Sequence, residues 1–179
     1  MASFTIQELE NMITVNMGDF KTASGDRKLI TRDLGSCVGI AMRDPQTGVG
    51  GLLHIMLPQY LPCQSSEPFV AAKYADTGLD ELVRALVQQG ANRERLVAKL
   101  AGAAHMIKSP NVPESMDISS RNLAAVRKKL EELRIPVLAA EVGEHHPRTV
   151  VFEPGNGTVR IVTSGRAEEM ISRGKVGTR

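Results

Sequence analysis

One turn signal constrains this chain more than any other feature. The segment DPQTG at residues 44–48 separates two apolar runs, residues 38–43 and 49–57. Proline suits the second position of a β-turn, and the preceding aspartate can accept a hydrogen bond from the backbone two residues on. The pattern predicts a β-hairpin, which would bring Cys37 and His54 toward one another.

The other segments predict a mixed architecture. The stretch PGNG at 154–157 separates two strand-like runs, 149–152 and 158–163, and predicts a second hairpin. Apolar residues recur at helical spacing in 79–87 and in 119–134. Residues 12–17, 29–32, 95–100 and 137–142 are further predicted strands, 69–75 a predicted helix and 18–28 a predicted loop. Strand-rich ends around helices favour an α+β fold in a single compact domain.

Composition and charge exclude several classes of protein. The 179 residues are 42% hydrophobic and include no Trp, 2 Tyr and 4 Phe, so a surface of stacked aromatic rings for RNA is not expected. The net charge of +2 is carried by residues 165–179, and a neutral body gives no basis for DNA binding. No apolar run approaches the ~20 residues of a membrane span.

The first candidate for chemistry is Cys37 with His54. Two cysteines are too few for a disulfide framework, so a cytoplasmic protein with reduced thiols is predicted. A thiol becomes nucleophilic near neutral pH when an imidazole takes its proton, and Gly35 permits a tight turn with free backbone amides. From the residues alone the signal is weak, because a lone histidine in an apolar strand is more often a structural, hydrogen-bonded core residue.

Two other candidates are weaker. A metal site could draw on His145, His146, His54 or Cys63, but the first two are adjacent in a loop and the four residues show no metal-ligand spacing. Gly48, Gly50 and Gly51 precede an apolar strand, whereas phosphate-binding glycines precede a helix. We therefore expect no metal site and no nucleotide site.

The segment LITRDLGSCVGIAMRDPQTGVGGLLHIMLP at 29–58 resembles the CheD family of bacterial chemoreceptor glutamine deamidases. In that family a Thr lies six residues before the catalytic Cys, and the catalytic His lies seventeen residues after it. Thr31, Cys37 and His54 match both spacings. The resemblance extends over roughly residues 13–162. The loops at 100–106 and 143–148 depart from the glycine-rich family pattern.

The resemblance implies an activity and a fold. It implies that Cys37 attacks a glutamine side chain of a chemoreceptor, that His54 transfers protons and that Thr31 orients His54, with glutamate and ammonia as products. It implies no cofactor and no metal. It also implies layered β-sheets with helices packed on the outside.

The same resemblance predicts partners and domain limits. The cytoplasmic helical bundle of a chemoreceptor would be the substrate and a CheC phosphatase a second partner, with no nucleic acid and with membrane proximity only through the receptor. Residues 1–164 would form the deamidase domain and 165–179 a flexible basic tail. The alternative function is a weakly catalytic or non-catalytic regulator that binds a CheC-type phosphatase.

Overall fold

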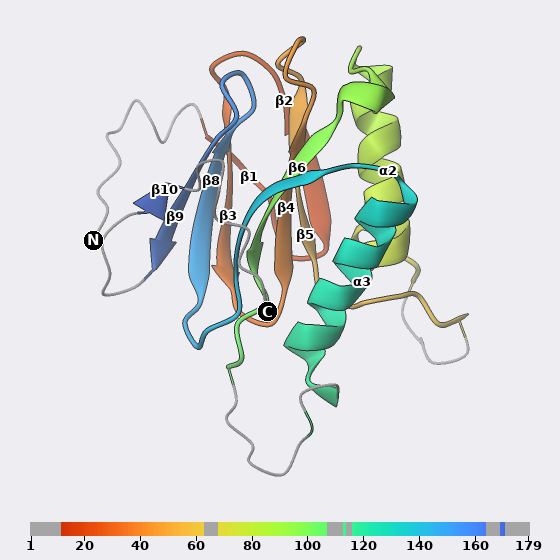
Figure 1. The fold of residues 1–179 in the computed structure, drawn as a ribbon, viewed down its shortest axis with the longest axis vertical. Coiled ribbons are helices and arrows are strands. Elements are labelled where there is room, and N and C mark those ends of the chain that lie inside the picture. Colours follow the sequence, from red (N-terminus) through yellow and green to blue (C-terminus); the bar gives the residue numbers. More distant parts are fainter. Residues whose placement is uncertain (1–11, 63–67, 107–112, 114–115, 164–168, 171–179) are drawn as a thin grey trace.

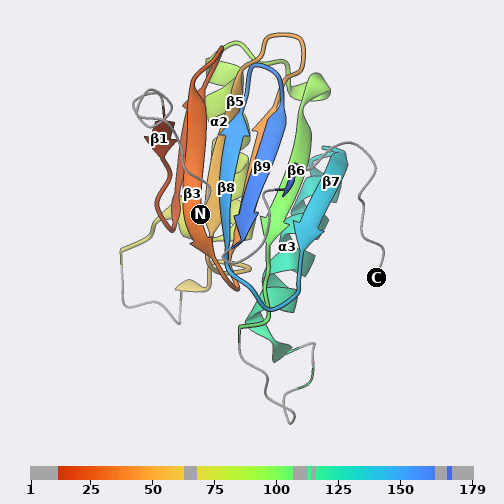
Figure 2. The same cartoon turned by 90° about the vertical axis from the view of Figure 1, so that its left-hand side faces the viewer.

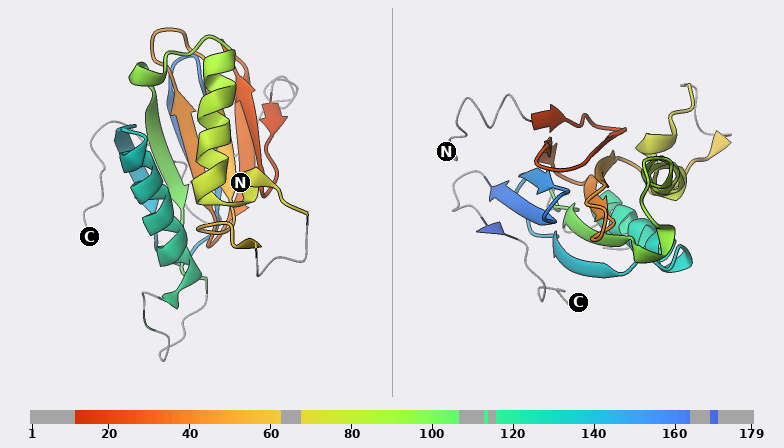
Figure 3. Two further views of the ribbon diagram at one scale, coloured as in Figure 1. Left: turned by 90° about the vertical axis from the view of Figure 1, so that its right-hand side faces the viewer. Right: turned by 90° about the horizontal axis from the view of Figure 1, so that it is seen from above.

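The computed structural model describes residues 12–62, 68–106, 113, 116–163 and 169–170 of the chain. They form three layers, in which one sheet packs on a second sheet and two helices cover the second sheet's far face (Figure 1). The predicted α+β domain of layered sheets is confirmed, and the two α-helices of the described residues lie on the same side of the sheets (Figure 3).

The first sheet, sheet A, has the strand order β1-β3-β8-β9-β10. β1 pairs parallel with β3, and the remaining pairs are antiparallel. Figure 2 shows β3, β8 and β9 as the layer in front of sheet B. The strands are β1 (Met12–Thr14), β3 (Lys28–Leu34), β8 (Arg148–Glu153), β9 (Thr158–Thr163) and β10 (Glu169–Met170).

Sheet B, of order β2-β5-β4-β6-β7, lies in the middle of the molecule. Its strands are β2 (Asp19–Ala23), β4 (Val38–Arg43), β5 (Gly50–Ile55), β6 (Val97–Gly102) and β7 (Val137–Val142). Every residue of β5 and all but the last of β4 are buried. Strands covered on both faces are apolar throughout rather than alternating, which explains the unbroken runs in the sequence.

Alternate residues of sheet B enter two separate cores. Ile40 and Leu53 belong to the core beneath the helices, whereas Ala41 and Leu52 belong to the core between the sheets. The helices that complete the first core are α2 (Ala75–Gln88) and α3 (Ile118–Glu132). The side chains at Leu79, Leu82 and Leu86 of α2 are fully buried, as helical spacing predicts.

The structure corrects two local predictions. Residues 18–28 are not a continuous loop, because Asp19–Ala23 form β2 at the edge of sheet B. The predicted helix at 69–75 is only a 3-10 turn, Ala71–Lys73, and Tyr74 has an extended backbone before α2 begins. β2 lies at the edge of the sheet and is rich in polar residues, so it does not show the alternation of apolar residues by which strands are predicted.

Two predictions concern parts of the chain that are largely not described. Of the predicted tail at 165–179, only β10 lies within the described residues. Cys63 lies outside them. None of the helices in the described part of the chain is long and apolar enough to span a membrane.

Candidate functional site

The β4–β5 hairpin places Cys37 and His54 on one face. The turn at 44–48 joins the two strands, and Gly39 lies opposite His54 in the antiparallel register. Cys37, two residues before Gly39, is therefore the diagonal neighbour of His54 on the face toward sheet A. A Cβ atom at Gly39 would lie 2.9 Å from Leu34 Cδ1. Glycine thus leaves room for the Leu34 side chain against β4.

Thr31 reaches His54 from the other sheet. Thr31 Oγ1 on β3 lies 2.7 Å from His54 Nδ1, and both side chains are buried. The same hydroxyl donates its hydrogen to the carbonyl of Val15 at 2.9 Å. Because a hydroxyl has one hydrogen, its oxygen must accept from the imidazole, and Nδ1 carries the proton. The two contacts therefore fix the tautomer in which Nε2 has the free lone pair.

His54 Nε2 is the open end of this arrangement. It is buried and has no hydrogen-bond partner within the part of the chain that the structure describes. Burial lowers the pKa of His54 to about 4, and the negative charge of Asp33 opposes that shift. The imidazole is thus neutral near pH 7 and able to accept a proton at Nε2.

Cys37 is a free, half-buried thiol that packs against the core between the sheets. Burial raises the pKa of the Cys37 thiol, and the residue's own backbone amide opposes this rise. A neutral thiol and a neutral imidazole therefore coexist in the resting site. The proton would move only when an electrophile engages the sulfur.

The loop before β4 is held by its carbonyl groups. Gly35 O accepts from Ala104 N, and Cys37 O accepts from Ala103 N, both at 2.7 Å. A Cβ atom at Gly102 would collide with the carbonyl oxygen of Cys37, so the segment after β6 can approach the loop only with glycine there. Within the described ranges, the amides of Ser36 and Cys37 donate to no other residue's backbone carbonyl.

Sequence reasoning did not single out Asn122. It is fully buried on α3, and its Nδ2 donates to Ser36 O at 3.0 Å and to Met56 O at 2.9 Å. The signal was present, because Asn122 falls in the buried stripe of α3 with Val126 and Leu130. A polar residue in such a stripe requires partners, and the partners lie beside the predicted site.

Two of the other histidines make contacts that do not involve His54. His105 Nδ1 contacts Asp117 Oδ2 at 2.9 Å, and His145 Nδ1 lies 2.9 Å from the carbonyl oxygen of His105. Among the described residues, no group of three His, Cys, Asp or Glu side chains could hold a metal ion.

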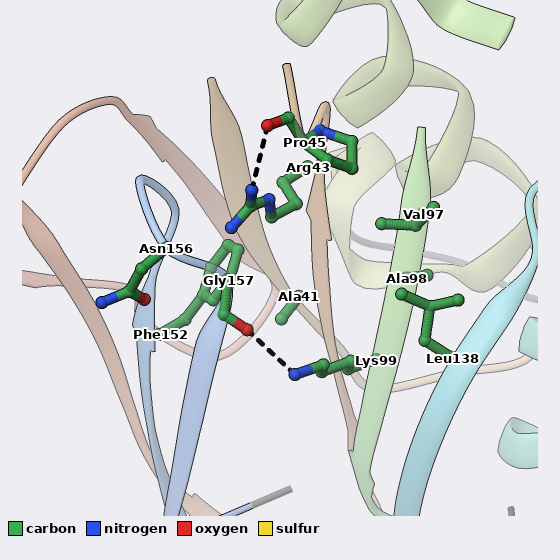
Figure 4. Close-up of a pocket in the computed structure, with 10 residues that line it drawn as sticks. All are labelled: Ala41, Arg43, Pro45, Val97, Ala98, Lys99, Leu138, Phe152, Asn156 and Gly157. Carbon is green, nitrogen blue, oxygen red and sulfur yellow. Dashed lines mark hydrogen bonds between the residues drawn. The ribbon is translucent and has the colours of Figure 1, made fainter. Parts of the chain in front are cut away.

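A separate cavity lies at the other end of β4. It has a volume of about 240 Å³ and is lined by Arg43, Lys99 and Phe152 among others (Figure 4). Arg43 donates to Pro45 O at 3.2 Å, and Lys99 donates to Gly157 O at 2.9 Å. Neither Cys37 nor any histidine is among the described residues that line it, so it is distinct from the Cys37–His54 site.

Comparisons with known proteins agree on one family. The family model described as "CheD chemotactic sensory transduction" matches residues 56–163. A "Probable chemoreceptor glutamine deamidase CheD" of Desulfitobacterium hafniense is 40% identical over 163 residues, which cover 91% of this chain and 100% of the relative. The "Chemoreceptor glutamine deamidase CheD" of Halalkalibacterium halodurans is 40% identical with the same two coverages.

Among solved structures, the Bacillus licheniformis hypothetical protein YfiH covers 71% of this chain with 51% of its own length, at 15% identity and a TM-score of 0.44. At that identity and TM-score, the likeness shows neither the fold nor the function of this chain.

Proposed function

Because this chain belongs to the CheD family, we propose that it is a chemoreceptor glutamine deamidase with Cys37 as its nucleophile. One observation carries the assignment of residues. The hydroxyl of Thr31 donates to Val15 O and lies 2.7 Å from His54 Nδ1, which leaves Nε2 unprotonated on the face that Cys37 shares.

The reaction follows from these groups. His54 Nε2 takes the thiol proton while Cys37 Sγ attacks the side-chain amide carbon of a glutamine. The resulting oxyanion needs donors, and the amides of Ser36 and Cys37, which donate to no other residue's backbone carbonyl among the described residues, can supply them. Collapse expels ammonia, which takes its proton from the imidazolium, and leaves a thioester. His54 then activates water, and hydrolysis releases glutamate and restores the thiol.

Thr31 acts through His54. Its oxygen accepts a hydrogen bond from the Nδ1–H group of His54. This bond holds the orientation of the ring and stabilises the imidazolium when it forms. A neutral hydroxyl stabilises that cation less than a carboxylate does. We therefore expect a slower enzyme than a thiol hydrolase with an acidic third residue. The chemistry requires no metal or cofactor.

The surroundings of the site suit a protein substrate. Exposed apolar side chains are present close to the reacting groups. Gly18 N donates to His54 O, which places Met17 next to β5, and Leu57 follows the same strand. Met106 packs within 3.1 Å of the position that a Cβ of Gly35 would take. An exposed apolar border of this kind is typical of contacts with another protein.

A second set of contacts extends this border. Phe69 is half exposed and its ring lies 4.5 Å from that of Tyr60. Tyr74 packs edge-on against Tyr60 at 5.1 Å, and its segment bridges to Leu57. We propose that this aromatic cluster and its apolar neighbours receive the helical bundle of the receptor.

The test is ammonia release from a purified, folded cytoplasmic fragment of a chemoreceptor. We expect one mass unit gained per modified glutamine and no reaction with Cys37→Ala. Free glutamine and short unstructured peptides should be poor substrates, since the site must accept a side chain that projects from a helix. Equal rates per glutamine on both forms would favour a small-molecule amidase.

We further propose that the protein works in the cytoplasm, without nucleic acid, and reaches the membrane only through its receptor. A CheC-type phosphatase is the proposed second partner. Co-purification of the two proteins and competition with the receptor fragment would test this. A Cys37→Ala variant that still regulates such a phosphatase would support the alternative of a binding regulator.

A further inference from the structure

The β4–β5 ladder stops where the site begins. Val38 and Ile55 are the last paired residues, and beyond them the chain runs through Cys37 and Ser36 on one side and Met56 on the other. Asn122 closes this gap from α3. Its Nδ2 donates to Ser36 O and to Met56 O, so one amide group joins the nucleophile loop to the end of the histidine strand.

The contact with Ser36 O fixes more than the position of the loop. No cis peptide occurs among the described residues, so the Ser36–Cys37 peptide is trans and planar. The carbonyl of Ser36 and the amide of Cys37 then point in opposite directions. Because the carbonyl points toward Asn122 on α3, the Cys37 N–H points to the opposite side. The Cys37 side chain packs against the core between the sheets.

The flanking carbonyls complete the arrangement. Gly35 O and Cys37 O are both held at 2.7 Å by the segment after β6. Three successive carbonyls are therefore anchored, and only the one between the other two depends on a side chain. The Cys37 amide has no carbonyl acceptor within the described residues, which leaves it available to a ligand.

We propose that Asn122 is the positioning residue of the oxyanion site, which holds the Ser36–Cys37 peptide so that the Cys37 N–H faces the reacting carbonyl. This inference rests on the proposed function and adds a residue to it. Asn122 does not contact the substrate. It acts by preventing rotation of one peptide group, and a donor must be correctly oriented before charge develops for it to lower the barrier.

Burial of Asn122 makes the assignment specific. The residue is fully buried, and its Oδ1 has no hydrogen-bond partner in the part of the chain described. A residue retained for stability alone would be expected to satisfy all its polar atoms. Asn122 uses both of its donor contacts on carbonyls beside the site and leaves its acceptor without a partner.

Two rates separate this role from a structural one. Deamidation passes through an oxyanion, whereas alkylation of Cys37 by iodoacetamide displaces iodide at a saturated carbon and needs no oxyanion donor. Asn122→Ala should lower kcat on the receptor fragment by about 30- to 100-fold, with KM nearly unchanged. The alkylation rate of Cys37 and its pH dependence should stay within about threefold of wild type.

A matched control is available on the same helix. Ser119 is also buried on α3, and its hydroxyl donates to Ala104 O at 2.8 Å without contacting the Ser36 carbonyl. Ser119→Ala should lose a similar amount of stability, about 1 kcal/mol, and should keep kcat near the wild-type value. Asn122→Ser, which retains a short donor, should recover part of the kcat lost in Asn122→Ala.

Several outcomes would overturn the inference. These are a kcat of Asn122→Ala within threefold of wild type, a parallel fall of kcat and alkylation rate, or failure of both Asn122 variants to fold. The last two would assign Asn122 a structural role. If wild-type protein releases no Cys37-dependent ammonia, the proposed function itself fails, and that result is distinct from the others.

Discussion

The two ends of the β4–β5 hairpin carry buried polar groups of opposite character. At the turn, Asp44 is fully buried and accepts four hydrogen bonds, from Gln46 N, Asn92 N and two nitrogens of Arg95. These contacts, Arg95 first, hold the pKa of Asp44 well below its usual range. At the other end, His54 Nε2 and Asn122 Oδ1 are buried without partners in the described structure.

The difference indicates what each end is for. A carboxylate that accepts four hydrogen bonds holds the turn in place and stabilises the fold. It has no lone pair left with which to bind a ligand. A buried imidazole nitrogen without a hydrogen-bond partner, such as His54 Nε2, lowers the stability of the fold. Its retention beside a thiol therefore indicates a role in a reaction. Burial and polarity alone do not separate Asp44 from His54, whereas the number of hydrogen-bond partners does. The turn end is not fully satisfied, because Arg43 Nε there is also buried without a partner among the described residues.

The largest expected effect is on the end of the hairpin that carries His54. His54→Gln removes the base and should lower ammonia release by about 10³-fold or more, since no group then takes the thiol proton as the sulfur attacks. Stability at pH 7 should change little. The measurement is turnover on the receptor fragment beside a denaturant titration. Activity within tenfold of wild type would remove His54 from the mechanism.

The next effect is on the turn end of the hairpin, which carries Asp44. Asp44→Ala should lower the free energy of unfolding by about 2 kcal/mol, because a buried network loses its shared acceptor while the half-exposed Arg95 can turn to water. The kcat of the folded protein should remain near wild type. Glu81→Ala, which breaks the exposed pair with Arg84, serves as the control and should cost less than about 0.5 kcal/mol.

A third prediction uses pH to separate the ends. The folded-state pKa of His54 is about 4, below the ordinary value of 6.5, so the unfolded chain binds the proton more tightly. Stability is therefore fully present above pH 6.5 and is lost as pH falls toward 4. Between pH 7 and pH 5 the wild type should lose about 2 kcal/mol more than His54→Gln. Parallel curves for the two proteins would contradict the lowered pKa.

The same pKa of His54 sets the pH at which activity should fall on the acidic side. The imidazole must be neutral to accept the thiol proton, so kcat/KM should persist down to about pH 5 and fall near pH 4, not near 6.5.

The smallest effect concerns Thr31. Thr31→Val preserves the shape but removes the hydroxyl that accepts from His54 Nδ1, and turnover should fall about tenfold. Thr31→Ser keeps the hydroxyl and should retain most of the activity. Receptor binding, measured by co-sedimentation, should be equal in all three proteins. An unchanged rate in Thr31→Val would leave the ring oriented by packing alone.

The sequence predicted the hairpins well because their turns are chemically explicit. DPQTG and PGNG are recognisable without a structure, and β7 and β9 begin and end at the predicted residues. β2 was missed because it is a short polar edge strand. Tyr74 interrupts the predicted helix at 69–75 because its segment pairs with Leu57, a tertiary contact that no local pattern reveals.

The sequence indicated candidate reactive residues, which remain a prediction, but not the groups that support them. Spacing and family resemblance identified Thr31, Cys37 and His54, and the structure joins Thr31 to His54 across two sheets. The Val15 carbonyl and Asn122 lie far from them in sequence and contribute through a backbone atom and a helix face. Such partners become visible only when the chain is folded.

The central position of β4 has a consequence for hydrogen exchange. The strand lies between β5 and β6, and its two faces contact separate cores. Its amides can meet solvent only when both cores open, so they should be among the slowest to exchange deuterium. Cys37 adjoins this strand directly. We therefore expect activity and secondary structure to be lost over the same range of temperature, because the loop that carries the thiol leads directly into this strand.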